Sequence, residues 1–380
     1  MKILFNQPAC MGAELDYVQD AITNNMHIAG DGLYTKKSQA LLEAVLSCPK
    51  VLLTTSCTHA LEMAALLLNM KPGDEVIVPS FTFVTTVNAF VLRGAKPVFI
   101  DVRADTLNMD ERQLERLITP KTRAIVLVHY AGVACEMDTI MAIAARYNLP
   151  VVEDNAHGLF GQYKGRYLGT FGCLATQSFH ETKNFTCGEG GALLINETSL
   201  IERAEVLREK GTNRSRFFRG EVDKYTWEDL GSSYVPSDIL AAFLYAQLEL
   251  WQKIQGKRQL IWNNYYNGIK SWAKENNVQL PYVPPECEQA YHLFSLIMPS
   301  LEHRQQLIAH LNQHEIKAVF HYLPLHVSKM GQTFGGKIGD CPVTENVSDR
   351  LVRLPLFNSM TSEEQQYIIQ CVLSFVPENS

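Results

Sequence analysis

Between residues 50 and 195 the sequence alternates short apolar runs with longer stretches of helical periodicity. Strands that are apolar on both faces and separated by helices are typical of a mainly parallel sheet that helices cover on both sides. We therefore predict an α/β fold with strands at 51–54, 75–79, 97–101, 123–128, 150–153, 175–179 and 192–195. The intervening helices are predicted at 59–69, 84–92, 111–118 and 137–147.

The rest of the chain predicts helices near 14–23, 35–46 and 199–210, then an irregular polar stretch at 211–234 that is rich in arginine and aromatic residues. Loops of that length are usually functional or form interfaces. A long helical pattern at 237–270 leads to predicted strands near 291–298 and 317–321 and helices at 303–314 and 362–373. We expect a large domain at 1–245 and a smaller α/β domain at 246–380.

Composition and charge exclude several classes of function. A net charge of -6 argues against a general nucleic-acid binder. No apolar stretch approaches membrane-spanning length, and the N-terminus lacks the pattern of a signal peptide. The nine cysteines are scattered and form no C-x-x-C pair, which predicts reduced thiols without a metal site. We expect a cytoplasmic protein that binds neither nucleic acid nor membrane.

Two segments follow predicted strands and open predicted helices. Ligands of open parallel sheets bind beyond the carboxyl ends of the strands. Ser56, Cys57 and Thr58 stand at such an end, where helix N-terminal amides and hydroxyls can bind phosphate, although an N-cap explains the serine and threonine more simply. Phe83 starts the next helix and can stack on an aromatic cofactor; a core phenylalanine is the alternative.

Two later strand ends carry ionisable residues. Asp154 ends the strand at 150–153 and His157 follows it, while Ser178 and Lys183 lie at the end of the strand at 175–179 before a glycine-rich run. A lysine in an apolar pocket has a lowered pKa and can attack an aldehyde, and a carboxylate can keep a pyridine nitrogen protonated. In this order the four segments predict a pyridoxal 5'-phosphate (PLP) site, with a strand-end cap as the alternative for Asp154.

The stretches TSCTHALEMAALLL, VVEDNAHGL, SFHETKNFTCGEGG and FHYLPLH resemble the DegT/DnrJ/EryC1/StrS family of sugar aminotransferases. The resemblance implies a PLP fold type I architecture, with a mostly parallel large-domain sheet and a smaller C-terminal α/β domain. It implies that Lys183 forms the Schiff base, Asp154 faces the pyridine nitrogen and Phe83 stacks on the ring. It places Thr58 and Ser178 on the phosphate and His157 in the cofactor pocket.

The run at 208–234 is similar to the subgroup that forms dTDP-4-amino-4,6-dideoxygalactose. This similarity implies transfer of the amino group of L-glutamate to C4 of a dTDP-4-keto-6-deoxyhexose, in the biosynthesis of lipopolysaccharide or another surface polysaccharide. It also implies a homodimer with shared active sites. Many relatives have Asn or Lys near Ser233, where the side chain reaches the neighbouring subunit's phosphate, and here serine would have to replace it. The alternatives are amination at C3, the 4-epimeric amine, and a non-catalytic regulator.

Four further residues are candidate substrate contacts. Arg214 and Arg219 lie in the polar stretch, where an arginine fork could bind the diphosphate or the glutamate carboxylates. The alternative for each is a solvated basic loop. His321 and His326 in FHYLPLH would lie near the cofactor mouth if the resemblance holds, and a core or capping role is the alternative.

Overall fold

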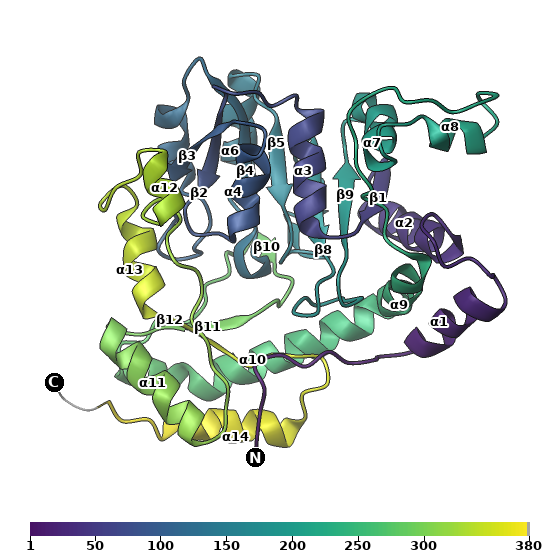
Figure 1. Ribbon diagram of the computed structural model, residues 1–380. Coiled ribbons are helices and arrows are strands. Elements are labelled where there is room, and N and C mark those ends of the chain that lie inside the picture. Colours follow the sequence, from purple (N-terminus) through teal and green to yellow (C-terminus); the bar gives the residue numbers. More distant parts are fainter. Residues whose placement is uncertain (378–380) are drawn as a thin grey trace.

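A computed structural model describes residues 1–377, and its central layer is a seven-stranded sheet (Figure 1). The strand order is β1-β9-β8-β5-β4-β2-β3, and β9 alone runs antiparallel to its neighbours. The strands are β1 (Lys50–Thr54), β2 (Glu75–Pro79), β3 (Lys96–Ile100), β4 (Thr122–Val128), β5 (Val151–Asp154), β8 (Leu174–Ser178) and β9 (Gly191–Ile195). Each predicted strand of this sheet is confirmed, with both ends within one residue.

Helices cover both faces of the sheet because each strand sends alternate apolar residues to opposite sides. Val76, Val78 and Val126 pack in one cluster with α3 (Cys57–Leu67), α4 (Val84–Val91) and α7 (Ile201–Arg208). Ile77 and Ile125 point to the other face, against α6 (Met137–Arg146) and α5 (Glu111–Leu114). Beside them, α2 (Leu33–Leu46) and α9 (Asp238–Glu249) cover the β1 end, and α1 (Glu14–Thr23) contacts α9. The mainly parallel α/β prediction is therefore confirmed.

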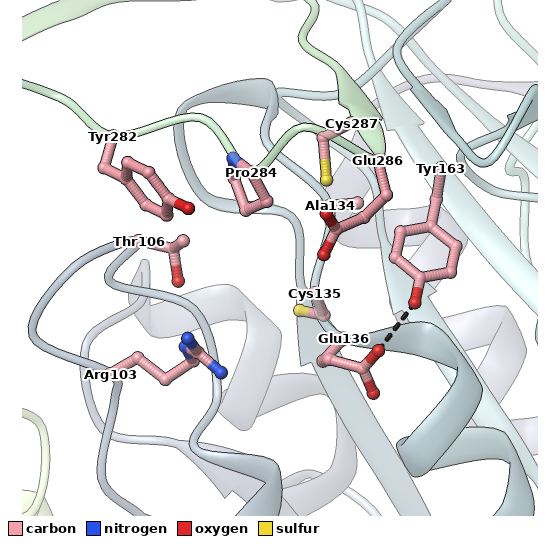
Figure 2. A pocket seen from close by; sticks show the side chains of 10 residues that line it. All are labelled: Arg103, Thr106, Ala134, Cys135, Glu136, Tyr163, Tyr282, Pro284, Glu286 and Cys287. Carbon is pink, nitrogen blue, oxygen red and sulfur yellow. Dashed lines mark hydrogen bonds between the residues drawn. The ribbon is translucent and has the colours of Figure 1, made fainter.

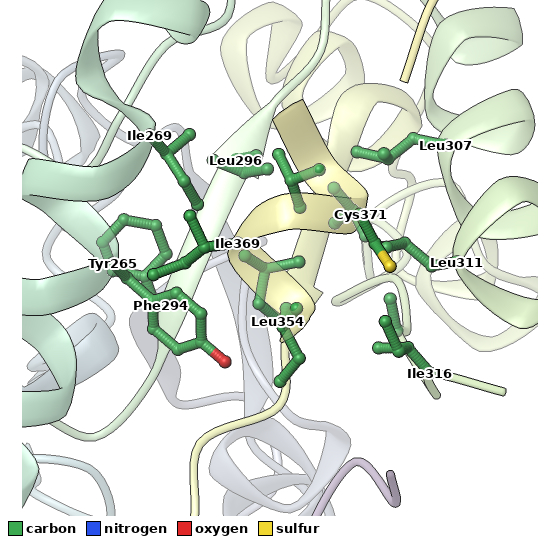
Figure 3. Close-up of a cluster of buried hydrophobic side chains, with 14 of the residues drawn as sticks. Tyr265, Ile269, Phe294, Leu296, Leu307, Leu311, Ile316, Leu354, Ile369 and Cys371 are labelled. Atoms are coloured by element: carbon green, nitrogen blue, oxygen red, sulfur yellow. The ribbon is translucent and has the colours of Figure 1, made fainter. Parts of the chain in front are cut away.

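A second cluster of buried apolar residues forms the core of the C-terminal part (Figure 3). It packs α10 (Trp251–Glu275), α11 (Leu301–Gln313) and α14 (Ser362–Leu373) around the antiparallel pair β11 (Phe294–Ile297) and β12 (Leu351–Leu354). Ile3 joins this cluster through a parallel bridge to Ile316, so the N-terminal segment lies beside the C-terminal part. The division at residue 245 stays a prediction.

Several predicted elements outside the seven-stranded sheet differ in the structure. The helical pattern at 237–270 is two helices, because Leu250 leaves the helical conformation between α9 and α10. The segment predicted as a strand at 317–321 makes only an isolated bridge, from Val319 to Arg353, while β12 was not predicted. The helix predicted at 111–118 is α5 followed by a 3-10 turn, Glu115–Leu117.

The remaining elements are short. A three-stranded sheet joins β6 (Gln162–Tyr163), β7 (Arg166–Tyr167) and β10 (Cys287–Glu288), and the short helices are α8 (Arg214–Phe218), α12 (Lys329–Thr333) and α13 (Pro342–Arg350). Across residues 1–377, no helix is both long enough and apolar enough to cross a bilayer.

Candidate active site

A cavity of about 740 Å³ opens at the carboxyl ends of the parallel strands. The residues that follow β1, β2, β5 and β8 line one side, and residues around β12 and the segment 319–322 line the other. This is where the topology of an open α/β sheet places a ligand. A second cavity, of about 80 Å³, lies between Arg103 and Tyr282 and contains no lysine (Figure 2).

The turn between β1 and α3 lies at the cavity. Ser56 is the N-cap of α3, and its hydroxyl accepts a hydrogen bond from the amide of His59 at 3.1 Å. The predicted cap is therefore present, yet Ser56, Cys57 and Thr58 also line the cavity. The amides in the first turn of a helix have no intrahelical acceptor, so they can bind an anion. A Cβ on Gly191 would lie 2.3 Å from the Ser56 backbone, which explains a glycine beside this turn.

Asp154 ends β5 with its carboxylate buried and oriented by two donors. Thr86 donates its hydroxyl proton to Oδ2 at 2.7 Å, and the Ala156 amide donates to Oδ1 at 3.2 Å. Burial raises the pKa of Asp154, and the hydrogen bond from Thr86 opposes that shift. Because Thr86 donates to the carboxylate, its oxygen accepts the hydrogen bond that joins it to Thr82 at 2.8 Å. Thr86 was not predicted as a site residue.

Lys183 lies in a tight loop after β8, where its amide donates to the carbonyl of His180 at 2.9 Å. Its side chain lines the cavity that Asp154 also lines. Burial lowers the pKa of the Lys183 amine, while Cys57 and Asp154 act in the opposite direction. A larger neutral fraction makes the amine a better nucleophile toward an aldehyde near neutral pH. Ser178, at the end of β8, lines the same cavity.

Aromatic rings form the wall between Asp154 and the C-terminal part. The ring of His157 stacks on that of His292, with centroids 4.1 Å apart and planes 19° apart. His321 bonds to the hydroxyl of Tyr130 at 2.9 Å. Burial holds the pKa of His157, His292 and His321 well below the usual value, so these rings are neutral at pH 7. Phe83 also lines this cavity, and 55% of its surface is exposed.

Arg353 is a cation of the cavity that sequence reasoning missed. Its guanidinium lies over the Phe5 ring at 4.7 Å and donates to the carbonyl of Phe320 at 3.2 Å. Its Nε is buried without a hydrogen-bond partner, and burial lowers the pKa of the group. The available signal was a single charge inside the apolar run LVRLPLF. His292 gave no comparable signal.

The other predicted contacts do not line the cavity of their own chain. Arg214 approaches Glu209 at 3.9 Å, and Arg219 pairs with Glu205 and Glu221 at 2.8 and 2.7 Å. Ser233 is exposed and forms a bridge with Glu209. Acidic and aromatic side chains, rather than the cavity, therefore contact these two arginines.

His326 is a buried structural residue, so its predicted substrate contact is corrected. Its Nδ1 bonds to the Ser80 hydroxyl at 2.6 Å and its Nε2 to Glu345 at 2.9 Å. Both ring nitrogens are occupied, and Ser80 is itself fully buried. The three residues tie the turn after β2 to α13, and the His326 ring is fully buried, as the alternative core role expects.

The cavity residues fit PLP by their chemistry. A buried carboxylate suits a protonated ring nitrogen, a buried amine suits an aldehyde carbon, and a helix N-terminus with hydroxyls suits a phosphate. Asp154, Lys183 and Thr58 supply these three groups in one cavity. Across residues 1–377 no group of three His, Cys, Asp or Glu side chains could hold a metal ion.

Comparisons with known proteins agree with this chemistry. Residues 9–373 match the model of the DegT/DnrJ/EryC1/StrS aminotransferase family, whose enzymes depend on PLP. The chain is 32% identical to GDP-perosamine synthase of Escherichia coli O157:H7 over 97% of both chains. It is 33% identical to the spore coat polysaccharide biosynthesis protein SpsC of Bacillus subtilis over 84% of both. Spr1654 from Streptococcus pneumoniae, solved in its PMP-form, superimposes with a TM-score of 0.89 at 27% identity, over 97% of this chain and 98% of that chain. The chain therefore belongs to the DegT/DnrJ/EryC1/StrS aminotransferase family.

Proposed function

We propose that the chain transfers the amino group of L-glutamate to C4 of a dTDP-linked 4-keto-6-deoxyhexose and forms dTDP-4-amino-4,6-dideoxygalactose. The observation that carries the transfer chemistry is the meeting of Lys183, Asp154 and the β1–α3 turn in one cavity. The resemblance of residues 208–234 to the subgroup that forms this amino sugar supports the choice of substrate. The relatives named for perosamine and for spore coat polysaccharide support a sugar acceptor and a role in surface polysaccharide biosynthesis.

Each residue has a part in this reaction. Bound PLP supplies an electron sink for the carbon that carries the amino group. Asp154 would hold the proton on the ring nitrogen, and Thr86 and the Ala156 amide orient its carboxylate. Lys183 would hold the cofactor through Nζ, and its amine is the group placed to move the proton at the reacting carbon. Phe83 would pack on the ring, and the β1–α3 turn would bind the phosphate.

Arg353 is our candidate for binding a donor carboxylate. Its Nε has no partner, and a guanidinium fork matches the two oxygens of a carboxylate. We expect Arg353→Gln to raise the KM for L-glutamate by roughly 10- to 100-fold, the effect of losing about 1.5–3 kcal/mol of charged hydrogen bonding. Steady-state kinetics with each substrate varied in turn measures this KM. The KM of Arg353→Lys should fall between those of the wild type and Arg353→Gln. An unchanged KM for glutamate would remove Arg353 from this role.

We also propose a cytoplasmic homodimer with shared active sites. The surface supports an interface, because Trp227 and Phe218 in the polar stretch are 77% and 69% exposed and Met26 is 81% exposed. Exposed aromatic side chains in one segment are typical of protein contacts. In such a dimer, Ser233, Arg214 and Arg219 could serve the partner's cavity. Size measurement in solution, with and without Trp227→Ser, tests the interface.

The proposed function has a direct spectroscopic test. Protein loaded with PLP should absorb near 410–430 nm, as expected of protonated lysine-bound PLP, and the band should move to shorter wavelength when L-glutamate is added. Adding dTDP-4-keto-6-deoxyglucose should restore the first band, and NMR of the product then gives the aminated carbon and its configuration.

Each outcome decides between the remaining alternatives. A product aminated at C3, or the 4-epimer, would keep the transaminase and change the sugar assignment. PLP binding without a response to glutamate would contradict the donor. Failure to bind PLP would contradict the assignment of Lys183 and Asp154 and favour the non-catalytic regulator.

A further inference from the structure

Arg258 of α10 is a buried cation whose hydrogen bonds all go to neutral groups. Its Nε donates to the carbonyl of Tyr291 at 2.9 Å, one terminal nitrogen donates to Asn358 Oδ1 at 2.9 Å, and the other donates to the carbonyl of His292 at 2.6 Å. Only 2% of the residue is exposed, and burial lowers the pKa of the guanidinium to about 9. Burying a charge without an opposite charge is unfavourable, so a stability role alone explains this arginine poorly.

The bonds of Arg258 lead to Asn184, the residue directly after Lys183. The Asn184 amide nitrogen donates to the carbonyl of Ala290 at 2.6 Å and to Gln255 Oε1 at 3.2 Å. Its Oδ1 meets His292 Nδ1 at 2.9 Å, and its backbone carbonyl accepts from Asn358 Nδ2 at 2.9 Å. Every hydrogen-bonding atom of the Asn184 side chain is therefore engaged by the C-terminal part.

The chemistry of the partners fixes the direction of each bond. A guanidinium can only donate, so Asn358 must present its oxygen to Arg258 and its amide nitrogen to the carbonyl of Asn184. The carbonyl of Ala290 can only accept, so Asn184 must present its oxygen to His292, which then carries its proton on Nδ1. Arg258 thus sets the orientation of the Asn358 amide, and through its bond to the His292 carbonyl it holds the backbone segment that bears the imidazole. The Ala290 carbonyl sets the orientation of the Asn184 amide.

We infer that Arg258 is a positioning residue for Lys183. Through Asn358, His292 and Asn184, it holds the loop after β8 that carries Lys183 (the lysine loop) against the C-terminal part. The inference rests on the proposed role of Lys183. For that role the Lys183 amine must keep the same position when it holds the cofactor and when it is free to move a proton. The same network holds His292 against the His157 ring in the cavity wall. Displacements of about 1 Å can cost on the order of 10²-fold in rate.

The matched control is Gln365 of α14, which binds the same helix. Gln365 is 2% exposed, donates to the carbonyl of Ile261 at 2.5 Å and accepts from Asn264 at 3.1 Å. Gln365→Met removes a buried polar anchor of α10 without touching the lysine loop. Arg258→Met removes one of similar burial that is linked to this loop through Asn358 and His292.

The first measurement is hydrogen–deuterium exchange on the protein without PLP. We expect the peptide that contains Lys183 to exchange about 10-fold faster in Arg258→Met and at the wild-type rate in Gln365→Met, since exchange follows local opening. With PLP bound, a single turnover with L-glutamate should be slowed on the order of 10²-fold in Arg258→Met only, with the dissociation constant for glutamate little changed. Arg258→Lys, which keeps the charge and part of the donation, should be intermediate.

The outcomes separate this inference from the proposed function. Wild-type exchange at Lys183 in Arg258→Met, or equal effects of the two variants, would overturn the positioning role. If Arg258→Met does not fold, Asn358→Ala cuts the same path at its next step and should show the same faster exchange; wild-type exchange in that variant would also overturn it. If wild-type protein gives no spectral response to glutamate, the proposed function fails, while the exchange comparison still decides whether Arg258 holds the loop.

Discussion

Replacing Lys183 with alanine should lower turnover by on the order of 10⁴-fold or more and remove the absorbance band of lysine-bound PLP. The amine has two tasks in the proposed reaction, holding the cofactor covalently and moving a proton, and alanine can do neither. Burial already lowers the pKa of this amine, which favours its neutral, reactive form. Steady-state rates and absorbance spectra of the two proteins at equal PLP content measure the effect.

Two further experiments separate chemistry from folding. Lys183→Arg keeps a positive charge, but the guanidinium stays protonated and cannot act as a nucleophile or base. This variant should therefore fold and remain inactive. A small primary amine added to Lys183→Ala should restore part of the turnover by supplying the missing base. Residual activity of Lys183→Ala above about one hundredth of wild type would contradict the assignment, because a single acid–base residue alone contributes about 10²–10⁴-fold.

The sheet could be predicted because its signal is local. Each strand is a short apolar run, and helical stretches with their turn residues separate the runs, so period and length sufficed to place its ends within one residue. The placement of Asp154 and Lys183 followed from the same pattern, since both stand at the carboxyl ends of predicted strands. The long helix prediction failed at Leu250 because a single non-helical residue leaves the apolar periodicity intact.

The rest of the site depends on contacts between distant segments. Thr86 lies 68 positions from Asp154, and His292 lies 108 positions from Asn184. No local pattern links such pairs. In the polar stretch, by contrast, a local pattern was misleading. Its arginine-rich composition indicated an anion site, but the fold places Glu205 and Glu221 beside Arg219. His326 lies in the family-like motif FHYLPLH, and only the structure shows both of its ring nitrogens occupied.

Asp154→Asn should lower kcat by on the order of 10²-fold or more while leaving the fold intact. The carboxylate stabilises the charge on the ring nitrogen, and the loss of one preorganised electrostatic partner typically costs about 10²–10³-fold. An amide cannot carry the charge. Asp154→Glu keeps the charge but shifts it away from Thr86 and should recover only part of the rate. Wild-type kcat in Asp154→Asn would contradict the pairing with the ring nitrogen.

The same substitution should change how the stability of PLP-free protein depends on pH. Burial raises the pKa of Asp154 above its ordinary value of 3.8, so the folded chain holds that proton more tightly than the unfolded chain does. The resulting stability is fully present below 3.8 and is lost as the pH rises through the folded pKa. Urea unfolding of wild type and Asp154→Asn across this window should show a loss of unfolding free energy that only the wild type suffers. If the unfolding free energies of the two proteins changed with pH in parallel, burial of the Asp154 carboxylate would not destabilise the PLP-free protein. If PLP reversed the loss seen in the wild type, the positive charge on the cofactor's ring would compensate the buried carboxylate.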